Sequence, residues 1–182
     1  APQNIFIAKD GMMVAGTQVS VDDVAAKLRE KIDAVVFNER SGATTLGAIQ
    51  NPATSQRIED VRSLGLAVIR DSARVDQPGF EGARTVSPIV LQTDTKRADI
   101  YTKEWFGPVS FLVVTDSFEA SVAEVVKSVR EQGALSALVY TTNNDRMTAS
   151  EDAIVNAGAP VAFNFNSFVW VNHSAAFSDF HG

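Results

Sequence analysis

Strand-like and helix-like hydrophobic patterns alternate along the chain, and this alternation narrows the possible folds more than any other feature. Short apolar runs rich in β-branched residues, such as NIFIA (4–8) and VSFLVVT (109–115), predict strands. Between such runs, apolar residues recur every third or fourth position, which is the period of a helix with one buried face. This order predicts an α/β fold of three layers, with a mostly parallel sheet flanked by helices.

Polar residues mark where the predicted helices begin. Ser20, with Asp23 three positions later, resembles a capping box, and the apolar positions 24, 28 and 32 that follow predict a helix. A second helix is expected to be capped by Thr54 or Ser55 and to stop at Gly65. Further helices are predicted from the cap at residues 116–117 to Gly133, and from residue 144 to Gly158.

The remaining extended runs complete the predicted sheet. Strands are expected within 66–70, 85–93, 135–142 and 160–172. In the second of these runs, Pro88 indicates a strand start or an edge strand. The methionines at 12 and 13 are expected to pack at a core edge. We expect one domain over 1–182, because no linker, repeat or low-complexity tract interrupts the pattern.

Composition excludes several classes of function. The 182 residues carry a net charge of −6 and no cluster of basic residues, so nucleic acid and anionic membrane surfaces are poor partners. Cysteine is absent, which excludes disulfides and a thiol nucleophile within this chain. With only two histidines, a multi-histidine metal site is not expected. We expect a cytoplasmic protein.

The stretch TKEWFGPV (102–109) is the main candidate site, because it places an acid between a lysine and two aromatic residues directly before a buried strand. A carboxylate such as Glu104 can accept hydrogen bonds from a ribose diol, and the face of Phe106 can flank a nicotinamide ring. A solvated loop with core-capping rings explains the same residues. The residues alone leave both interpretations open.

A hydrolase is a weaker alternative. Ser174 lies next to His173, and Asp179 lies near His181. Triad members are normally brought together by the fold and not by adjacency in sequence, so a polar loop explains this stretch better. No Gly-x-Ser-x-Gly elbow, dinucleotide fingerprint or P-loop is present in the sequence.

KEWFGPV resembles the Glu-Glu-x-Phe-Gly-Pro-Val signature of the aldehyde dehydrogenase superfamily. In the same order, LGAIQNPATSQRI, SPIVLQTD, GALSALVYTTN and VWVN resemble other family segments. Each match alone is weak, but five matches in order over about 130 residues are a strong signal. The opening APQNIFI and the closing VNHSAAFSDFHG resemble the phenylacetic acid degradation (PaaN) branch.

The resemblance implies roles for individual residues. Glu104 matches the acid that holds the nicotinamide ribose, and Phe106 matches the ring beside the nicotinamide. Asn172 matches the end of the family's Val-Asn pair. Residues that follow it line the substrate entrance in the family, and His173, Phe177 and Phe180 are the candidates for that lining.

Two departures from the family pattern bear on these roles. Lys103 and Trp105 replace the usual Glu and Ile of the signature, and neither change removes the cofactor acid. About eight additional residues, PVAFNFNS, precede the VWVN match, where the family is usually shorter, and they lie next to the segments expected to form the local strand pairing and the substrate lining.

The resemblance also implies a parent enzyme, an NAD(P)-dependent aldehyde dehydrogenase that oxidises an aldehyde to an acid in aromatic degradation. Its catalytic thiol is expected a few residues before Ala1, so this chain is expected to be an inactive part of the catalytic domain that does not bind NAD or NADP alone. Family members are dimers or tetramers, so the resemblance implies that the parent enzyme forms a homo-oligomer. The alternative is a stand-alone binding or assembly domain without catalysis.

Overall fold

The computed structural model describes residues 2–38 and 41–166, and the chain divides into two compact units, Ala1–Ser117 and Phe118–Gly182. Each unit contains a buried apolar cluster of its own. The single domain that the sequence predicts over 1–182 stays a prediction.

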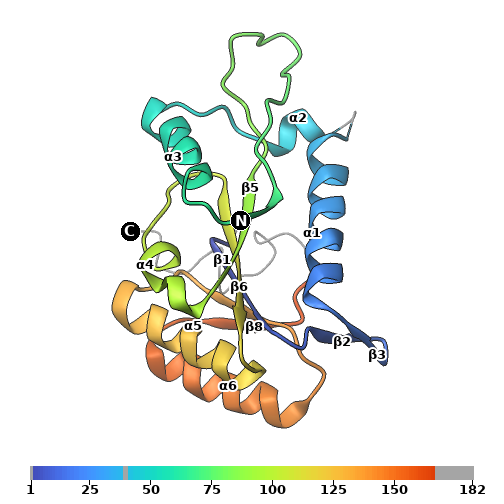
Figure 1. Ribbon diagram of the computed structural model, residues 1–182, viewed down its shortest axis with the longest axis vertical. Coiled ribbons are helices and arrows are strands. Elements are labelled where there is room, and N and C mark those ends of the chain that lie inside the picture. The colour runs from blue at the N-terminus through green and yellow to red at the C-terminus, as the bar shows by residue number, and fades with distance from the viewer. Residues whose placement is uncertain (1, 39–40, 167–182) are drawn as a thin grey trace. The chain divides into compact units, whose positions relative to one another are not determined.

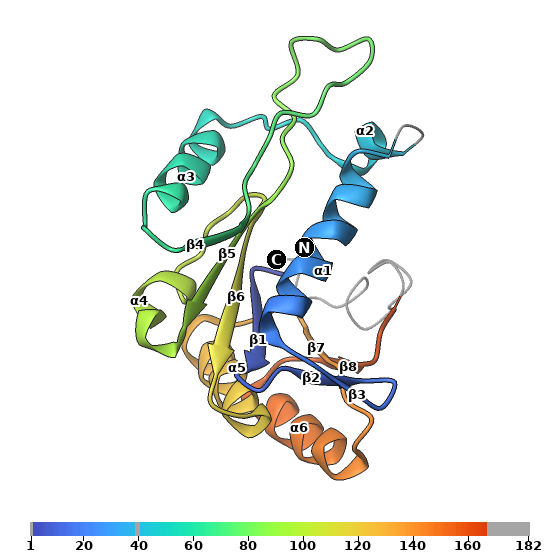
Figure 2. The same cartoon turned by 45° about the vertical axis from the view of Figure 1, so that its right-hand side comes forward.

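The first unit is built on a four-stranded sheet in the order β1-β6-β5-β4. Strands β1 (Asn4–Ala8), β6 (Val109–Thr115) and β5 (Ile89–Asp94) run parallel, and the edge strand β4 (Ala67–Arg70) runs antiparallel to β5 (Figure 2). β6 is buried at nearly every position, as the apolar run at 109–115 predicted. A strand covered on both faces has this pattern.

Helices cover both faces of this sheet (Figure 1). Helix α1 (Val21–Val36) packs on one face, where Val21 and Ala25 meet Leu112. Helices α3 (Pro52–Arg62) and α4 (Ala98–Tyr101) pack on the other face, around Phe111. The predicted three-layer α/β fold with a mostly parallel sheet is confirmed.

Capping explains where the long helices begin. Ser20 Oγ accepts a hydrogen bond from the Asp23 backbone N–H at 3.1 Å, and the Asp23 carboxylate accepts one from Ser20 N–H, so the predicted start of α1 is confirmed. The predicted cap of α3 at Thr54 or Ser55 is wrong. The helix begins earlier because Asn51 Oδ1 accepts a hydrogen bond from Ala53 N–H, and proline follows at the first helical position.

A small hairpin between β1 and α1 was not predicted. Strands β2 (Met12–Val14) and β3 (Thr17–Val19) pair antiparallel across a two-residue turn. Both turn residues have positive φ, 49° at Ala15 and 81° at Gly16, as a tight hairpin turn requires. Met13 is 58% exposed, so the prediction that the two methionines pack at a core edge is wrong. The tight turn folds β2 back on β3 alone, which leaves these side chains in solvent.

The long connection from β4 to β5 projects as a loop (Figure 1). Pro88 lies directly before β5, which confirms the strand-start interpretation. The edge-strand interpretation is wrong, because β5 pairs with β6 on one side and β4 on the other. Short helical turns, α2 (Gly42–Thr45) and η1 (Thr95–Arg97), precede α3 and α4 respectively.

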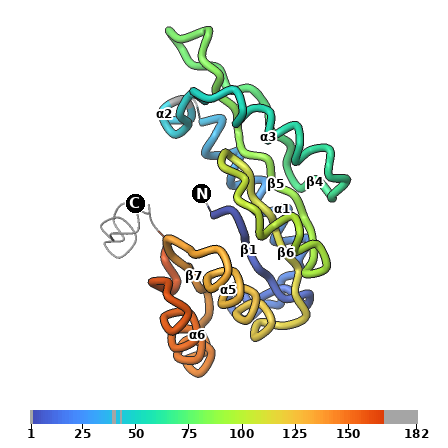
Figure 3. Tube along the Cα trace, turned by 90° about the vertical axis from the view of Figure 1, so that its left-hand side faces the viewer, coloured from blue at the N-terminus to red at the C-terminus, as the bar shows by residue number. Residues whose placement is uncertain are grey.

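The second unit contains α5 (Phe118–Gln132), β7 (Ala137–Val139), α6 (Asn144–Ala157) and β8 (Val161–Phe163). Helices α5 and α6 lie side by side (Figure 3). Strands β7 and β8 form a parallel pair. Gly158 ends α6 at φ 107°, as predicted. Of the predicted extended segment 160–172, residues 167–172 lie outside the described part of the chain.

Candidate functional site

Glu104 and Phe106 lie on the connection between α4 and β6, and both are exposed. Phe106 is 68% exposed, a large fraction for a ring of this size. The connection ends where β6 begins, and β6 starts in register with the amino ends of its parallel neighbours: Asn4 pairs with Phe111, and Ile89 pairs with Val109. The acid and the ring therefore lie at the amino edge of the parallel strands.

Trp105, between them, points into the protein. Its indole Nε1–H donates a hydrogen bond to the Ile100 carbonyl at 2.9 Å, and its ring lies 6.4 Å from the Phe111 ring. The aromatic residues of this stretch therefore divide into one that anchors the core and one that faces solvent. The core-capping interpretation of the sequence is correct for Trp105, and it does not account for Phe106.

The side chains of Gln3 and Asn4, at the start of β1, hold the connection through hydrogen bonds. Gln3 Nε2 donates to the carbonyls of Tyr101 and Lys103, at 3.1 and 2.7 Å, and Gln3 Oε1 accepts from the Trp105 N–H at 2.9 Å. Asn4 Nδ2 donates to the same Tyr101 carbonyl at 2.9 Å. Gln3 could not be predicted from the sequence, because these bonds join residues about 100 positions apart.

Helix α3 holds the other end of the connection. Arg57 Nη1 donates to the Phe106 carbonyl at 3.3 Å. Gly107 has a φ of 152°, and a Cβ added there would lie 2.9 Å from Thr54 Cγ2. A side chain at this position would meet both backbone strain and a steric clash, so glycine is required for α3 to approach so closely.

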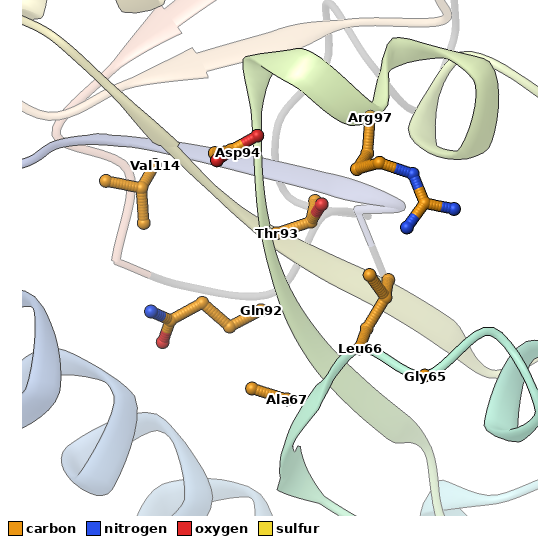
Figure 4. Close-up of a pocket in the computed structure, with 8 residues that line it drawn as sticks. All are labelled: Gly65, Leu66, Ala67, Gln92, Thr93, Asp94, Arg97 and Val114. Carbon is orange, nitrogen blue, oxygen red and sulfur yellow. The ribbon is translucent and has the colours of Figure 1, made fainter.

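Two surface hollows are found in the first unit, and the described residues that line them include neither Glu104 nor Phe106. One hollow, of about 450 Å³, wraps around the carboxyl end of β5. Figure 4 shows Gln92 on one side of the strand and Arg97 with Leu66 on the other. The carboxylate of Asp94 accepts a hydrogen bond from Lys96 N–H at 2.8 Å, so it caps η1.

The second hollow, of about 210 Å³, lies between α3 and the loop after β4. Arg62 in its lining is paired with Glu59 and Asp71, and these two carboxylates raise the pKa of the guanidinium. Neither hollow was predicted from the sequence, and neither shows a set of converging groups that identifies a reaction.

The remaining predicted site residues, Asn172, His173, Phe177 and Phe180, lie outside the described residues, as do Ser174, Asp179 and His181. Within the described ranges, no group of three or more His, Asp or Glu side chains could hold a metal ion. No helix in the same ranges is long and apolar enough to cross a membrane.

Fold and loop together define a class of protein: an α/β catalytic-domain-like unit that presents an acid and a ring at the amino edge of its parallel strands. Residues 13–178 match the sequence model of the aldehyde dehydrogenase family, and the chain belongs to this family.

Individual relatives agree with this assignment. A solved structure described as an NAD-dependent aldehyde dehydrogenase from Burkholderia multivorans is 37% identical, with a TM-score of 0.90 over 98% of this chain. A probable methylmalonate-semialdehyde/malonate-semialdehyde dehydrogenase (acylating, mitochondrial) from Drosophila melanogaster is 28% identical over 139 residues, or 72% of this chain. A benzaldehyde dehydrogenase structure from Corynebacterium glutamicum, 20% identical with a TM-score of 0.58 over 90% of this chain, shares the fold.

The chain spans only part of each of these relatives. It covers 32% of the Burkholderia and Corynebacterium chains and 26% of the Drosophila protein.

Proposed function

We propose that this chain forms the cofactor-facing part of the catalytic domain of an NAD(P)-dependent aldehyde dehydrogenase, which oxidises an aldehyde to an acid. The observation that carries the proposal is the exposed Glu104–Phe106 pair on a connection whose backbone is held at both ends. Family membership and the 37% identity to a protein described as an NAD-dependent aldehyde dehydrogenase support it.

The exposed groups fit the nicotinamide end of a dinucleotide. Glu104 would accept hydrogen bonds from the ribose hydroxyls, and the Phe106 ring would lie beside the nicotinamide. The dinucleotide, when bound, supplies the acceptor for the aldehyde hydride. Because these 182 residues include no cysteine, the thiolate that attacks the aldehyde would come from outside them.

The substrate is proposed to be an aldehyde of aromatic degradation, on the resemblance of APQNIFI and VNHSAAFSDFHG to the phenylacetic acid degradation (PaaN) branch. His173, Phe177 and Phe180 are proposed to line the substrate entrance. The proposal includes a cytoplasmic location and self-association into a homo-oligomer, as expected from the sequence. The Drosophila relative's name points to a different substrate class, a short semialdehyde with acyl transfer.

A chimera tests the activity directly. The matching third of the Burkholderia multivorans enzyme is replaced by this chain, and formation of NADH or NADPH is followed by absorbance. We expect turnover with an aromatic aldehyde or a ring-derived semialdehyde, and faster turnover there than with malonate semialdehyde plus coenzyme A. A folded chimera that oxidises none of these substrates contradicts the proposal.

Variants of the same chimera test the acid. Glu104→Gln removes the charge that strengthens the ribose hydrogen bonds, so we expect the KM for the dinucleotide to rise by about tenfold to a hundredfold. Glu81→Gln, an exposed acid on the loop after β4, is the matched control and should leave KM unchanged. Equal KM values for both variants would contradict the role of Glu104 in binding the dinucleotide, whereas a folded chimera without any turnover would favour the stand-alone binding or assembly domain.

A further inference from the structure

We infer that Gln3 is a positioning residue that sets the backbone on either side of Glu104, an assignment that rests on the proposed function of the Glu104–Phe106 pair. One side-chain amide uses both its ends on the connection that carries the pair. Its NH₂ group donates to the carbonyl of Lys103, the residue before Glu104, and its oxygen accepts from the N–H of Trp105, the residue after it.

The geometry of these bonds restrains Glu104 in particular. The distances of 2.7 Å to Lys103 O and 2.9 Å to Trp105 N are those of well-formed hydrogen bonds. Holding the peptide groups on both sides of one residue limits its φ and ψ, and so limits the direction in which its side chain leaves the backbone. An exposed carboxylate otherwise has considerable rotational freedom, which a ligand has to restrict on binding.

Gln3 is itself fixed by the sheet. Its backbone carbonyl accepts from Phe111 N–H at 2.7 Å, and the preceding carbonyl of Pro2 accepts from Ser110 Oγ at 2.7 Å. Both donors belong to β6, the strand that follows the connection. The side-chain amide of Gln3 therefore fixes the connection relative to the paired strands β1 and β6. Gln3 and Trp105 are separated by 102 positions in the sequence.

Neighbouring contacts do not replace this role. Asn4 Nδ2 bonds only to the Tyr101 carbonyl, three residues before Glu104, and Arg57 bonds to the Phe106 carbonyl, two residues after it. Gln3 alone among these side chains bonds to both residues adjacent to Glu104.

Hydrogen exchange in the 182-residue chain tests the clamp without requiring activity. Gln3→Met keeps the length of the side chain and removes its hydrogen bonds. We expect the Trp105 amide to exchange at least tenfold faster in this variant, while the Phe111 amide, bonded to the Gln3 backbone, stays protected. The matched control, Ser110→Ala, removes a bond to the same amino end of β1 and should leave the Trp105 amide protected.

The functional consequence is measured in the Burkholderia chimera. Gln3→Met should raise the KM for the dinucleotide by about tenfold, whereas Ser110→Ala should lower thermal stability without that change in KM. If Gln3→Met does not fold, Gln3→Asn keeps the amide but is one methylene too short to reach, and it gives the same comparison.

The two experiments test the positioning role of Gln3 separately from the proposed enzyme function. Unchanged exchange of the Trp105 amide in the Gln3 variant overturns the positioning role whatever the chimera does. Equal KM values for the Gln3 variant and the unsubstituted chimera overturn it also. An unsubstituted chimera that is folded but inactive contradicts the proposed function, and the positioning of Glu104 then stands or falls on the exchange of Trp105.

Discussion

At the scale of single residues, Gly107 shows how closely the candidate loop is packed. Its φ of 152° and the 2.9 Å approach of Thr54 Cγ2 to a built Cβ leave no room for a side chain. The carbonyl immediately before it, that of Phe106, is the one that accepts from Arg57. A change at Gly107 should therefore disturb the Phe106 backbone as well as the stability of the fold.

We expect Gly107→Ala to destabilise the chain by about 1–3 kcal/mol, since it combines a strained backbone with a contact that α3 has to relieve. Gly82→Ala is the matched control: its φ is outside the range that disfavours side chains and its surroundings are open, so a change below about 0.5 kcal/mol is expected. Urea unfolding monitored by circular dichroism measures both values, and equal midpoints would contradict the interpretation of Gly107.

At the scale of the elements, Arg70 joins a helix, a strand and a loop. It is 6% exposed and lies at the end of β4. Its Nε donates to Asp33 Oδ1 of α1 at 2.7 Å, and its Nη1 donates to Ser87 Oγ at 2.6 Å and Pro88 O at 2.9 Å. The guanidinium therefore links α1 to β4 and to the start of β5.

Arg70→Lys should cost about 3 kcal/mol, because a single ammonium cannot replace a planar group that donates in several directions from a buried position. Arg84→Lys is the control: this exposed arginine also bonds to two backbone carbonyls, those of Ile49 and Gln50, and should cost less than about 1 kcal/mol. Denaturant unfolding of the two variants measures both losses of stability. A loss as small in Arg70→Lys as in Arg84→Lys would refute the linking role of Arg70.

A second link between elements depends on pH. Lys9 follows β1 and Asp116 follows β6, and their side chains pair at 2.9 Å. The Lys9 ammonium lowers the pKa of Asp116, first through a hydrogen bond and then through its charge, and Asp116 raises the pKa of Lys9 in the same two ways. Both groups are solvent-exposed, so the contribution to stability is small and sensitive to salt.

The pH dependence of this contribution to stability follows from the directions of the two pKa shifts. The contribution of Asp116 is fully present above its unfolded value of 3.8 and is lost as pH falls through its lower folded pKa. The contribution of Lys9 is fully present below 10.5 and is lost as pH rises through its higher folded pKa. A double-mutant cycle with Lys9→Met and Asp116→Asn should show favourable coupling at neutral pH that vanishes at both extremes. Coupling that grows on acidification would contradict this.

At the scale of the whole molecule, each unit has an apolar core of its own. In the first unit, Phe111 of β6 is fully buried in a cluster with residues of helices α3 and α4. In the second unit, Ile154 is fully buried among Val129, Val139 and Ala159. The amides of each unit should therefore report on the packing of its own cluster.

Ile154→Ala should lower the free energy of opening in α5 and α6 by about 2–5 kcal/mol, because it leaves a cavity in a closed cluster. Val155→Ala, at the next position on α6 but 54% exposed, serves as the control and should change protection little. Hydrogen exchange read by mass spectrometry gives both values. Unchanged protection of α5 and α6 in Ile154→Ala would show that this cluster does not stabilise the unit.

A structural feature can be predicted from the sequence when the interaction that decides it joins residues a few positions apart. Ser20 and Asp23 predicted the start of α1, and Gly158 predicted the end of α6, because capping is decided within a few residues. Asn51 and Pro52 carry a capping signal of the same short range, and this signal sets the start of α3. The exposure of Met13 was not predictable from its hydrophobicity, since it follows from a turn that pairs β2 with β3 alone.

By itself, then, the sequence determined the alternation of helices and strands, the burial of β6 and the stretch that carries Glu104 and Phe106. Only the tertiary structure decided the strand order, the antiparallel pairing of β4 and the separation of Trp105, which is packed inside, from its exposed neighbours. Periodicity and capping act over a few residues, whereas strand order and the Gln3 contacts join positions about 100 residues apart. Which of those distant contacts form depends on the free energy of the packed chain as a whole, which no local pattern records.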